Sequence, residues 1–299
     1  MNTSTPALIT PELARSLMPR RADDAHKGSF GRALIIAGSR QYTGAAKLAL
    51  QAASRSGAGL VFAAIPEPLH APLAASLSEP IWLILPTRNG AIAAEAGKII
   101  PTILADKDAV LVGPGLSQTE GTRAFLLTLL EHLRGEAPKL PLAVDADALN
   151  LLSKEPDWHK LLLPECAVLT PHEMEFSRLT GLPLSEIHSN REELAARCAQ
   201  EWQQTLILKG AHTLVCSPQG ECRLLPFANS VLAHGGTGDV LAGLVVGLLA
   251  QGLLPFDAAS LAVWLHARAA ELAMQAVGHP ASTLPSDILA HIGASMRSL

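Results

Sequence analysis

The segment Gly235-Gly236-Thr237-Gly238-Asp239 runs directly into the apolar residues 240–250. Glycine allows the backbone to turn at positive φ and to approach a ligand closely. The first amides of the following helix have no partner inside it, so they can bind a phosphate or a developing oxyanion. The pattern predicts an anion site at Gly236, Thr237 and Gly238, with Asp239 placed to accept the proton of an acceptor hydroxyl in phosphoryl transfer.

An ordinary loop that ends in a helix cap explains the same residues. Thr237 can cap the helix through its hydroxyl, and the negative charge of Asp239 favours the first helical turn. Gly243 and Gly247 further along fit tight packing against a neighbouring element. The choice between a simple cap and a catalytic site therefore depends on the rest of the chain.

Composition narrows the class of protein. The 299 residues are 48% hydrophobic and carry a net charge of -4 with no block of like charge. No polar linker divides the chain, so we expect residues 1–299 to form a single domain. Basic clusters and aromatic residues are too few for a nucleic-acid surface, and the run 240–250 is too short to span a membrane.

The cysteines and histidines give no sign of a metal centre. Eleven histidines are scattered without a zinc-binding spacing, and the four cysteines show no C-x-x-C pattern. The N-terminus lacks the pattern of a signal peptide, so we expect a reducing, cytoplasmic environment. The cysteines are Cys166, Cys198, Cys216 and Cys222.

Short apolar runs alternate with amphipathic segments along the chain. This alternation predicts an α/β fold, a three-layer α/β/α sandwich with a mainly parallel sheet and helices on both faces. The expected strands are 33–37, 60–65, 109–112, 142–144, 167–169 and 205–208, followed by a hairpin of 213–216 and 222–225. The expected helices are 45–56, 120–133, 173–180, 191–203, 240–251, 256–277 and 285–292.

Polar and glycine-rich loops follow most of these strands, and in such folds ligands bind at the carboxyl ends of parallel strands. Each loop also has a structural explanation. Gly113-Pro114-Gly115 is either an anion nest or a strand-ending turn. Asp145 and Asp147 either orient Mg²⁺ or a ligand hydroxyl, or cap a short helix. Lys209 either meets a nucleotide phosphate or is a solvated turn residue.

Thr170-Pro171-His172-Glu173 has the pattern of a helix start. We expect Thr170 to be the cap, Pro171 to take the first helical position, and Glu173 to complete a capping box. This leaves His172 and Glu175 unexplained, three residues apart on one helix face beside the sheet edge. Such a pair is placed to contact substrate or, in the case of Glu175, a metal-bound water.

Taken in order, these motifs resemble the ADP-dependent NAD(P)H-hydrate dehydratases, whose fold is ribokinase-like. The likeness covers nearly the whole chain. It is most specific in Lys27-Gly28-Ser29-Phe30-Gly31, Arg55-Ser56-Gly57-Ala58-Gly59-Leu60-Val61 and Lys209-Gly210-Ala211-His212-Thr213. After Thr170-Pro171-His172 the family commonly has Pro-Gly-Glu, whereas this chain has Glu173-Met174-Glu175.

The resemblance implies a carbon–oxygen lyase that repairs a damaged cofactor. The S-epimer of NADH hydrate or NADPH hydrate would be returned to NAD(P)H with ADP as co-substrate and Mg²⁺ as cofactor, releasing AMP and phosphate. Asp239 would be catalytic. The substrate contacts would be Ala45, Gly115, His172 and Asp239, and the nucleotide contacts Lys209, Gly210, Ala211, His212, Thr213 and Gly238. A homotetramer is implied, together with a separate NAD(P)H-hydrate epimerase, because no epimerase domain is expected within 1–299.

Two alternatives stay open. A ribokinase-like kinase for a hydroxymethyl-pyrimidine or hydroxyethyl-thiazole alcohol would use the same anion site and Asp239. The small residues at 44–46 and 113–116 favour a larger acceptor, such as a dinucleotide. A non-catalytic nucleotide sensor would keep the fold without turnover, and the intact Asp239 and its glycines argue against that.

Overall fold

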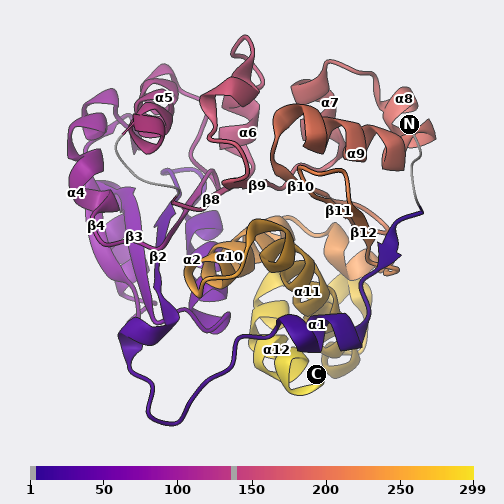
Figure 1. The fold of residues 1–299 in the computed structure, drawn as a ribbon. Helices are drawn as coiled ribbons and strands as arrows, with labels where there is room; N and C mark the ends of the chain where they lie inside the picture. Colours follow the sequence, from indigo (N-terminus) through magenta and orange to yellow (C-terminus); the bar gives the residue numbers. More distant parts are fainter. Residues whose placement is uncertain (1–4, 136–139) are drawn as a thin grey trace.

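A computed structural model describes residues 5–135 and 140–299, in which one large sheet lies between two layers of helices (Figure 1). The sheet has ten strands in the order β1-β12-β11-β10-β9-β8-β7-β2-β3-β4, and β5 pairs with β6 separately. The strands are β1 (Ala7–Leu8), β2 (Arg32–Ile36), β3 (Leu60–Pro66), β4 (Ile81–Leu85), β5 (Thr87–Arg88), β6 (Ala91–Ile92), β7 (Ala109–Val112), β8 (Leu142–Val144), β9 (Ala167–Leu169), β10 (Thr205–Leu208), β11 (Leu214–Cys216) and β12 (Cys222–Leu224).

The sheet is mainly parallel, as predicted. Only β11 runs antiparallel to its neighbours, β10 and β12, so the predicted hairpin is confirmed. In β2 the side chains of Leu34 and Ile35 are both fully buried although they point to opposite faces. Helices must therefore cover both faces, which is the condition for a parallel sheet.

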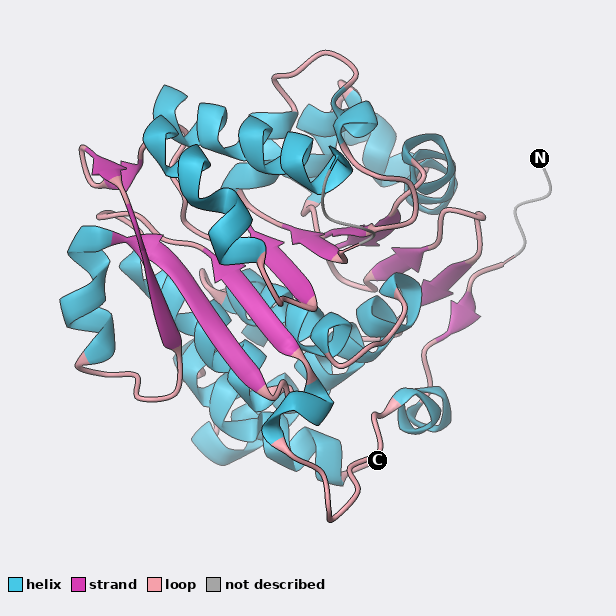
Figure 2. Ribbon diagram, turned by 60° about the vertical axis from the view of Figure 1, so that its left-hand side comes forward, coloured by secondary structure: helices cyan, strands magenta, loops and turns pink. Residues whose placement is uncertain are grey.

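The helices form two layers, and Figure 2 shows the sheet enclosed between them. Helices α2, α10, α11 and α12 cover one face, while α5, α6, α7 and α9 cover the other (Figure 1). The bounds are α1 (Pro11–Leu17), α2 (Thr43–Arg55), α3 (His70–Ala74), α4 (Ile100–Leu104), α5 (Glu120–Gly135), α6 (Asp147–Leu152), α7 (Glu173–Thr180), α8 (Leu184–Ser189), α9 (Arg191–Trp202), α10 (Thr237–Ala250), α11 (Pro255–Val277) and α12 (Pro285–Arg297). The predicted three-layer sandwich is confirmed.

Helix α10 lies unusually close to α2 because two of its residues have no side chain. A Cβ on Gly243 would lie 2.3 Å from the carbonyl oxygen of Ala49, and one on Gly247 would lie 1.8 Å from the hydroxyl of Ser56. The predicted tight packing at these glycines is confirmed. The contact fixes the position of α10, and with it the glycine-rich turn at its N-terminus.

Several short elements were not predicted from the sequence, namely β1, β4, the β5–β6 pair, α1, α3, α4 and α8. Strand β4 is one of the two edge strands of the sheet, and Ile81 and Ile84 remain partly exposed on it. Pro80 and Pro86 flank this strand, where a missing amide costs no ladder bond. Within the described ranges, no helix is long and apolar enough to cross a bilayer.

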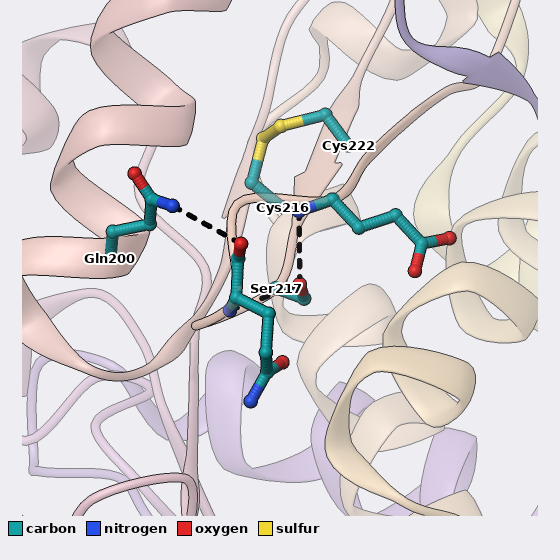
Figure 3. The surroundings of a disulfide bond; sticks show 6 residues. Gln200, Cys216, Ser217 and Cys222 are labelled. Carbon is teal, nitrogen blue, oxygen red and sulfur yellow. Dashed lines mark hydrogen bonds between the residues drawn. A yellow bond between two sulfur atoms is a disulfide. The ribbon is translucent and has the colours of Figure 1, made fainter. Parts of the chain in front are cut away.

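A disulfide joins Cys216 to Cys222 across the β11–β12 hairpin (Figure 3). The two residues are directly opposite each other in the antiparallel register, with Cα atoms 4.2 Å apart. The Ser217 hydroxyl accepts hydrogen bonds from the amides of Gln219 and Glu221 and so holds the connecting turn. The sequence analysis did not anticipate this bond, because six residues separate the cysteines and only strand pairing brings them together.

Candidate functional site

The glycine-rich turn ends at Gly236, which caps α10 in a left-handed conformation (φ 99°). Thr237 is the first helical residue, and its hydroxyl donates to the carbonyls of Leu232 and His234. The alternative in which Thr237 caps the helix is therefore wrong, because its hydroxyl is engaged with the preceding turn. The amides of Gly238 and Asp239 have no acceptor among the described residues, so the helix start is available to an anion.

A buried ion pair lies beside this helix start. Lys209 follows β10, and its Nζ is 2.9 Å from Oδ1 of Asp145, which directly follows β8, two strands away in the sheet. The Thr170 hydroxyl donates to the same carboxylate oxygen at 2.6 Å. A Cβ on Gly238 would lie 3.4 Å from the ammonium of Lys209. The interpretation of Lys209 as a solvated turn residue is wrong, since its charge lies under the N-terminus of α10.

These charges set the protonation of Asp239. Burial raises the pKa of the Asp239 carboxyl to about 7, and the nearby carboxylate of Asp145 contributes in the same direction. Burial acts against the charged form of Lys209, yet the carboxylates of Asp145 and Glu175 outweigh it and leave the pKa of Lys209 raised. Asp239 therefore titrates near neutral pH, as a general base requires, beside a permanent cation.

The start of α7 is built differently from the prediction. His172 is the cap, and its Nδ1 accepts the amide hydrogens of Met174 and Glu175 at 3.1 and 3.2 Å. Glu175 in turn accepts the His172 amide at 2.9 Å, so His172 and Glu175 form the capping box. Thr170 and Glu173 do not form it, because the Thr170 hydroxyl is bonded to Asp145.

This cap also fixes the chemistry of the histidine. With Nδ1 accepting, a neutral His172 carries its proton on Nε2. Burial lowers the pKa of His172, and the positive charge of Lys209 lowers it further. Burial likewise raises the pKa of Glu175, whose Oε2 is 3.8 Å from Lys209 Nζ. His172 is thus a neutral hydrogen-bond donor at the mouth of the site.

The loops after β2 and β7 meet at the same edge of the sheet. Gly115 has φ 62°, and a Cβ there would lie 3.0 Å from the Cβ of Ala45, so these two predicted substrate residues are neighbours. Asp147 is the first residue of α6 and accepts bonds from the Ser117 amide and the Gln118 side chain. Asp147 thus ties the β7 loop to α6, while Asp145 faces Lys209.

Two cavities adjoin at Lys209 and Gly238, which line both of them. The first, which we name the apolar cavity, has a volume of about 530 Å³ and is largely hydrophobic. It is lined by Lys209, Gly210, Ala211, Thr213, Leu225, Phe227, Ala228, Asn229, Ser230, Leu232, Ala233, Thr237, Gly238, Leu241, Val263, His266 and Ala267. Five of the six predicted nucleotide residues line it, and His212 is the exception.

The second, which we name the polar cavity, has a volume of about 680 Å³ and contains most of the charged groups. It is lined by Asp145, Ala146, His172, Glu173, Met174, Glu175, Leu184, His188, Lys209, Gly210, Leu232, Ala233, His234, Gly235, Gly236, Thr237, Gly238 and Asp239. His172 and Asp239 line it, whereas Ala45 and Gly115 lie at the same sheet edge outside its lining. Both volumes suit small-molecule ligands.

Six described residues line both cavities, and we call the boundary where the cavities adjoin the shared wall. These residues are Lys209, Gly210, Leu232, Ala233, Thr237 and Gly238. Asp239 is next to this wall, on the side of the polar cavity. A ligand in each cavity would therefore meet the other at the N-terminus of α10. This is the arrangement that a direct transfer between two bound molecules needs.

The sequence analysis missed one buried side chain of the apolar cavity. His266 on α11 is 5% exposed, and its Nε2 has no hydrogen-bond partner among the described residues. Burial lowers its pKa to about 4, and the charge of Lys209 acts in the same direction, so the imidazole is neutral. A single histidine in an apolar helix carries no sequence signal that would distinguish it from a core residue.

The sheet and the glycine-led helix that follows it have the ribokinase-like α/β fold. Residues 33–293 match the family model of the NAD(P)H-hydrate dehydratases, and the chain belongs to this family.

Curated relatives agree with this membership. The ADP-dependent (S)-NAD(P)H-hydrate dehydratase of Bacillus subtilis is 35% identical over 88% of this chain and 88% of its own length. The bifunctional NAD(P)H-hydrate repair enzyme Nnr of Moorella thermoacetica is 39% identical over 98% of this chain. The chain spans 54% of that bifunctional relative, and about half the length of the other bifunctional relatives it matches.

A solved structure has the same fold over nearly the whole chain. The ADP/ATP-dependent NAD(P)H-hydrate dehydratase of Bacillus subtilis, co-crystallised with ATP and Mg²⁺, superposes with a TM-score of 0.80 at 33% identity. The match covers 99% of each chain. The ribokinase-like fold predicted from the sequence is confirmed.

Proposed function

We propose that this chain catalyses the ADP-dependent dehydration of the S-epimer of NADH hydrate and NADPH hydrate, giving NAD(P)H, AMP and phosphate. One observation carries the proposal: Asp239 lies at the wall between two cavities, with open helix amides and Lys209 beside it. The apolar cavity would hold the nucleotide and the polar cavity the hydrate. The relatives named as dehydratases support this assignment over a small-molecule kinase.

The first step is a phosphoryl transfer. Ionised Asp239 accepts the proton of the hydrate's hydroxyl, whose oxygen then attacks the terminal phosphorus of ADP, and the bond to the AMP oxygen breaks. The amides at Gly238 and Asp239 and the ammonium of Lys209 stabilise the charge on the transferred group. His172, as a neutral Nε2 donor, is placed to orient the acceptor in the polar cavity.

The second step is elimination. Hydroxide is a poor leaving group, whereas phosphate leaves readily, so the carbon–oxygen bond of the phosphorylated hydrate breaks and the dihydropyridine ring is restored. The released phosphate takes the electrons of that bond, the neighbouring ring carbon loses a proton as its C–H electrons form the restored double bond, and the phosphate accepts this proton and leaves as the dianion. The same helix amides that received the phosphoryl group hold the departing dianion.

We assign magnesium to no cluster of the protein's own side chains. Among the described residues, no three His, Cys, Asp or Glu side chains gather as a metal site. Glu175, the predicted water-mediated ligand, accepts the His172 amide and faces Lys209. We propose that Mg²⁺ enters bound to the nucleotide phosphates, the mode in which it keeps most of its waters.

Assembly and cellular setting are part of the same proposal. We propose a homotetramer, which sedimentation of the purified protein would test, and a separate NAD(P)H-hydrate epimerase that supplies the S-epimer. The bifunctional relatives support such a pairing. A cytoplasmic location is proposed from the substrate, since NADH and NADPH are intracellular.

The test is recovery of the reduced-nicotinamide absorbance when the protein is mixed with NADH hydrate, ADP and Mg²⁺, with ATP in a parallel sample. Asp239→Asn should abolish recovery. Asp257→Asn is the matched control, because Asp257 is also the third residue of its helix but pairs with Arg223 away from both cavities. No recovery with either nucleotide, with hydrate intact and protein folded, would favour the small-molecule kinase. Nucleotide binding without turnover of any acceptor would favour a sensor.

A further inference from the structure

Arg191, the first residue of α9, is hydrogen-bonded to the loop that follows β10. Its Nη2 donates to the carbonyls of Leu208 and Lys209 at 3.0 and 3.1 Å. Its Nη1 donates to the carbonyls of Ala211 and His212 at 3.1 and 2.7 Å. One guanidinium thus binds four carbonyls within five residues of the chain. The sequence analysis gave Arg191 no role beyond starting a helix.

These four hydrogen bonds, which we call the Arg191 clamp, fix the direction of the amides in the loop. In a trans peptide the N–H points opposite to the preceding C=O, so the amides of Lys209, Gly210, His212 and Thr213 point away from Arg191. Those of Lys209 and His212 donate to the carbonyls of Pro171 and Phe227. The other two belong to Gly210 and Thr213, which line the apolar cavity. The clamp therefore leaves the amides of two cavity-lining residues pointing away from Arg191.

Local structure alone does not favour an arginine at this position. A cation in the first turn of a helix opposes the helix dipole, and the side chain is only 16% exposed. Its Nε has no hydrogen-bond partner among the described residues. Gly210 has φ 152°, and a Cβ there would lie 2.7 Å from Arg191 Nη2. The loop accommodates the guanidinium only because position 210 is glycine.

A short chain of contacts joins this clamp to the polar cavity. Oε1 of Glu173, at the start of α7, lies 3.5 Å from Arg191 Nε. Its Oε2 is 2.9 Å from Nε2 of His188. Glu173 and His188 both line the polar cavity. A ligand that contacts His188 can therefore alter the position of Glu173 and, through it, the clamp on the loop of the other cavity.

We propose that Arg191 is a positioning residue for the nucleotide, and that Glu173 and His188 couple nucleotide binding to occupancy of the polar cavity. The inference rests on the proposed function in two respects, the assignment of the nucleotide to the apolar cavity and of the hydrate or its product to the polar cavity. Arg191 acts through the backbone of residues 208–212 and touches neither ligand.

Direct binding of ADP, measured by calorimetry without hydrate, tests the clamp. Arg191→Lys keeps the charge but cannot bind four carbonyls, so the Kd for ADP should rise on the order of 10- to 100-fold. Arg197→Lys is the matched control on the same helix, since Arg197 makes an exposed pair with Glu201, and the Kd of this variant for ADP should change by less than about twofold. In turnover, Arg191→Lys should raise the KM for ADP more than it lowers kcat.

A second variant, Gly210→Ala, tests the clamp independently of Arg191→Lys. Gly210→Ala places a methyl group against the guanidinium and should weaken ADP binding like Arg191→Lys, whereas Gly181→Ala, also at positive φ but with open space around it, should not. Folded Arg191→Lys and Gly210→Ala proteins that bind ADP like wild type would overturn the clamp and leave the proposed reaction intact.

The coupling has its own measurement. The Kd for ADP is compared with and without saturating NADH, the stable product that the proposed function assigns to the polar cavity. Wild type should show a difference, and His188→Ala should reduce it, while His159→Ala, on a remote 3₁₀ turn, should not. An equal NADH effect in wild type and His188→Ala would overturn the coupling. Wild-type protein that binds ADP but restores no NADH would instead contradict the proposed reaction, and protein that binds no nucleotide would contradict both.

Discussion

Asp239→Asn should make the protein more stable while it removes activity. The carboxyl is held in a largely buried position beside Asp145, where its charged form is unfavourable, and its pKa is about 7 instead of the ordinary 3.8. The folded state therefore binds the proton more tightly than the unfolded chain. Stability is lost as pH rises from about 4 to about 7, because folding must then hold a charge that water would solvate better.

The size of this effect follows from the two pKa values. Their difference corresponds to about 4 kcal/mol at pH above 7, and solvent screening in the open polar cavity reduces the expected value to about 2 kcal/mol. Asn has nearly the same shape and no charge to desolvate. We expect Asp239→Asn to raise Tm by about 2–4 °C at pH 8, and the gain should vanish near pH 4.

The activity of the wild type should depend on the same titration of Asp239, but it should rise with pH where stability falls. Below pH 7 the base is protonated, so kcat/KM of the wild type should fall about tenfold for each unit of pH. The assays are thermal unfolding of both proteins from pH 4 to 8 and hydrate turnover from pH 5.5 to 8. Lower stability of Asp239→Asn at pH 8, or a flat wild-type activity profile across that range, would refute the account of Asp239.

Three further outcomes are expected. In Asp145→Asn the neighbouring negative charge is lost, so the pKa of Asp239 falls and the acid limb of kcat/KM moves to lower pH; an unmoved limb would contradict this. Gly247→Ala forces a methyl group onto the Ser56 hydroxyl and should cost about 3 kcal/mol in denaturant unfolding, whereas Gly293→Ala, with open space around it, should be neutral or stabilise by up to about 1 kcal/mol. Reducing the β11–β12 disulfide should cost about 2 kcal/mol, and unfolding curves that coincide with and without reductant would show that the bond contributes nothing.

The central sheet was predictable because its strands are buried on both faces. The run 109–112 is continuously apolar between Asp108 and Gly113, the run 205–208 is apolar after Thr205 and ends before Lys209, and the observed bounds of both agree to the residue. Strand β4 was not predicted, because it is an edge strand with two partly exposed isoleucines and so does not have the sequence pattern of a buried strand. The disulfide depends on register across a hairpin, which spacing alone does not determine.

The site was predictable in its location and less so in its internal bonds. Loops at strand ends converge because parallel strands share one edge, and this brought Asp145, Lys209 and Asp239 together. The local sequence pattern predicted Thr170 as the cap of α7, whereas His172 caps it. The Thr170 hydroxyl instead donates to the carboxylate of Asp145, which is distant in sequence. The role of Arg191 was not predicted, because its partners are backbone carbonyl groups distant in sequence. Every residue type carries such a group, so the sequence does not mark them.

The wall that the two cavities share has a consequence for the chemical biology of this fold. Because six described residues line both cavities, ligands in the two cavities would be adjacent, and a single molecule could occupy both sites at once through a very short tether. Joining an adenosine phosphate to a dihydropyridine alcohol would make the second contact intramolecular, and its effective concentration would reach the millimolar range. Such a bisubstrate compound would trap both partners of the transfer in one step, and it would select for proteins in which the two cavities adjoin in this way.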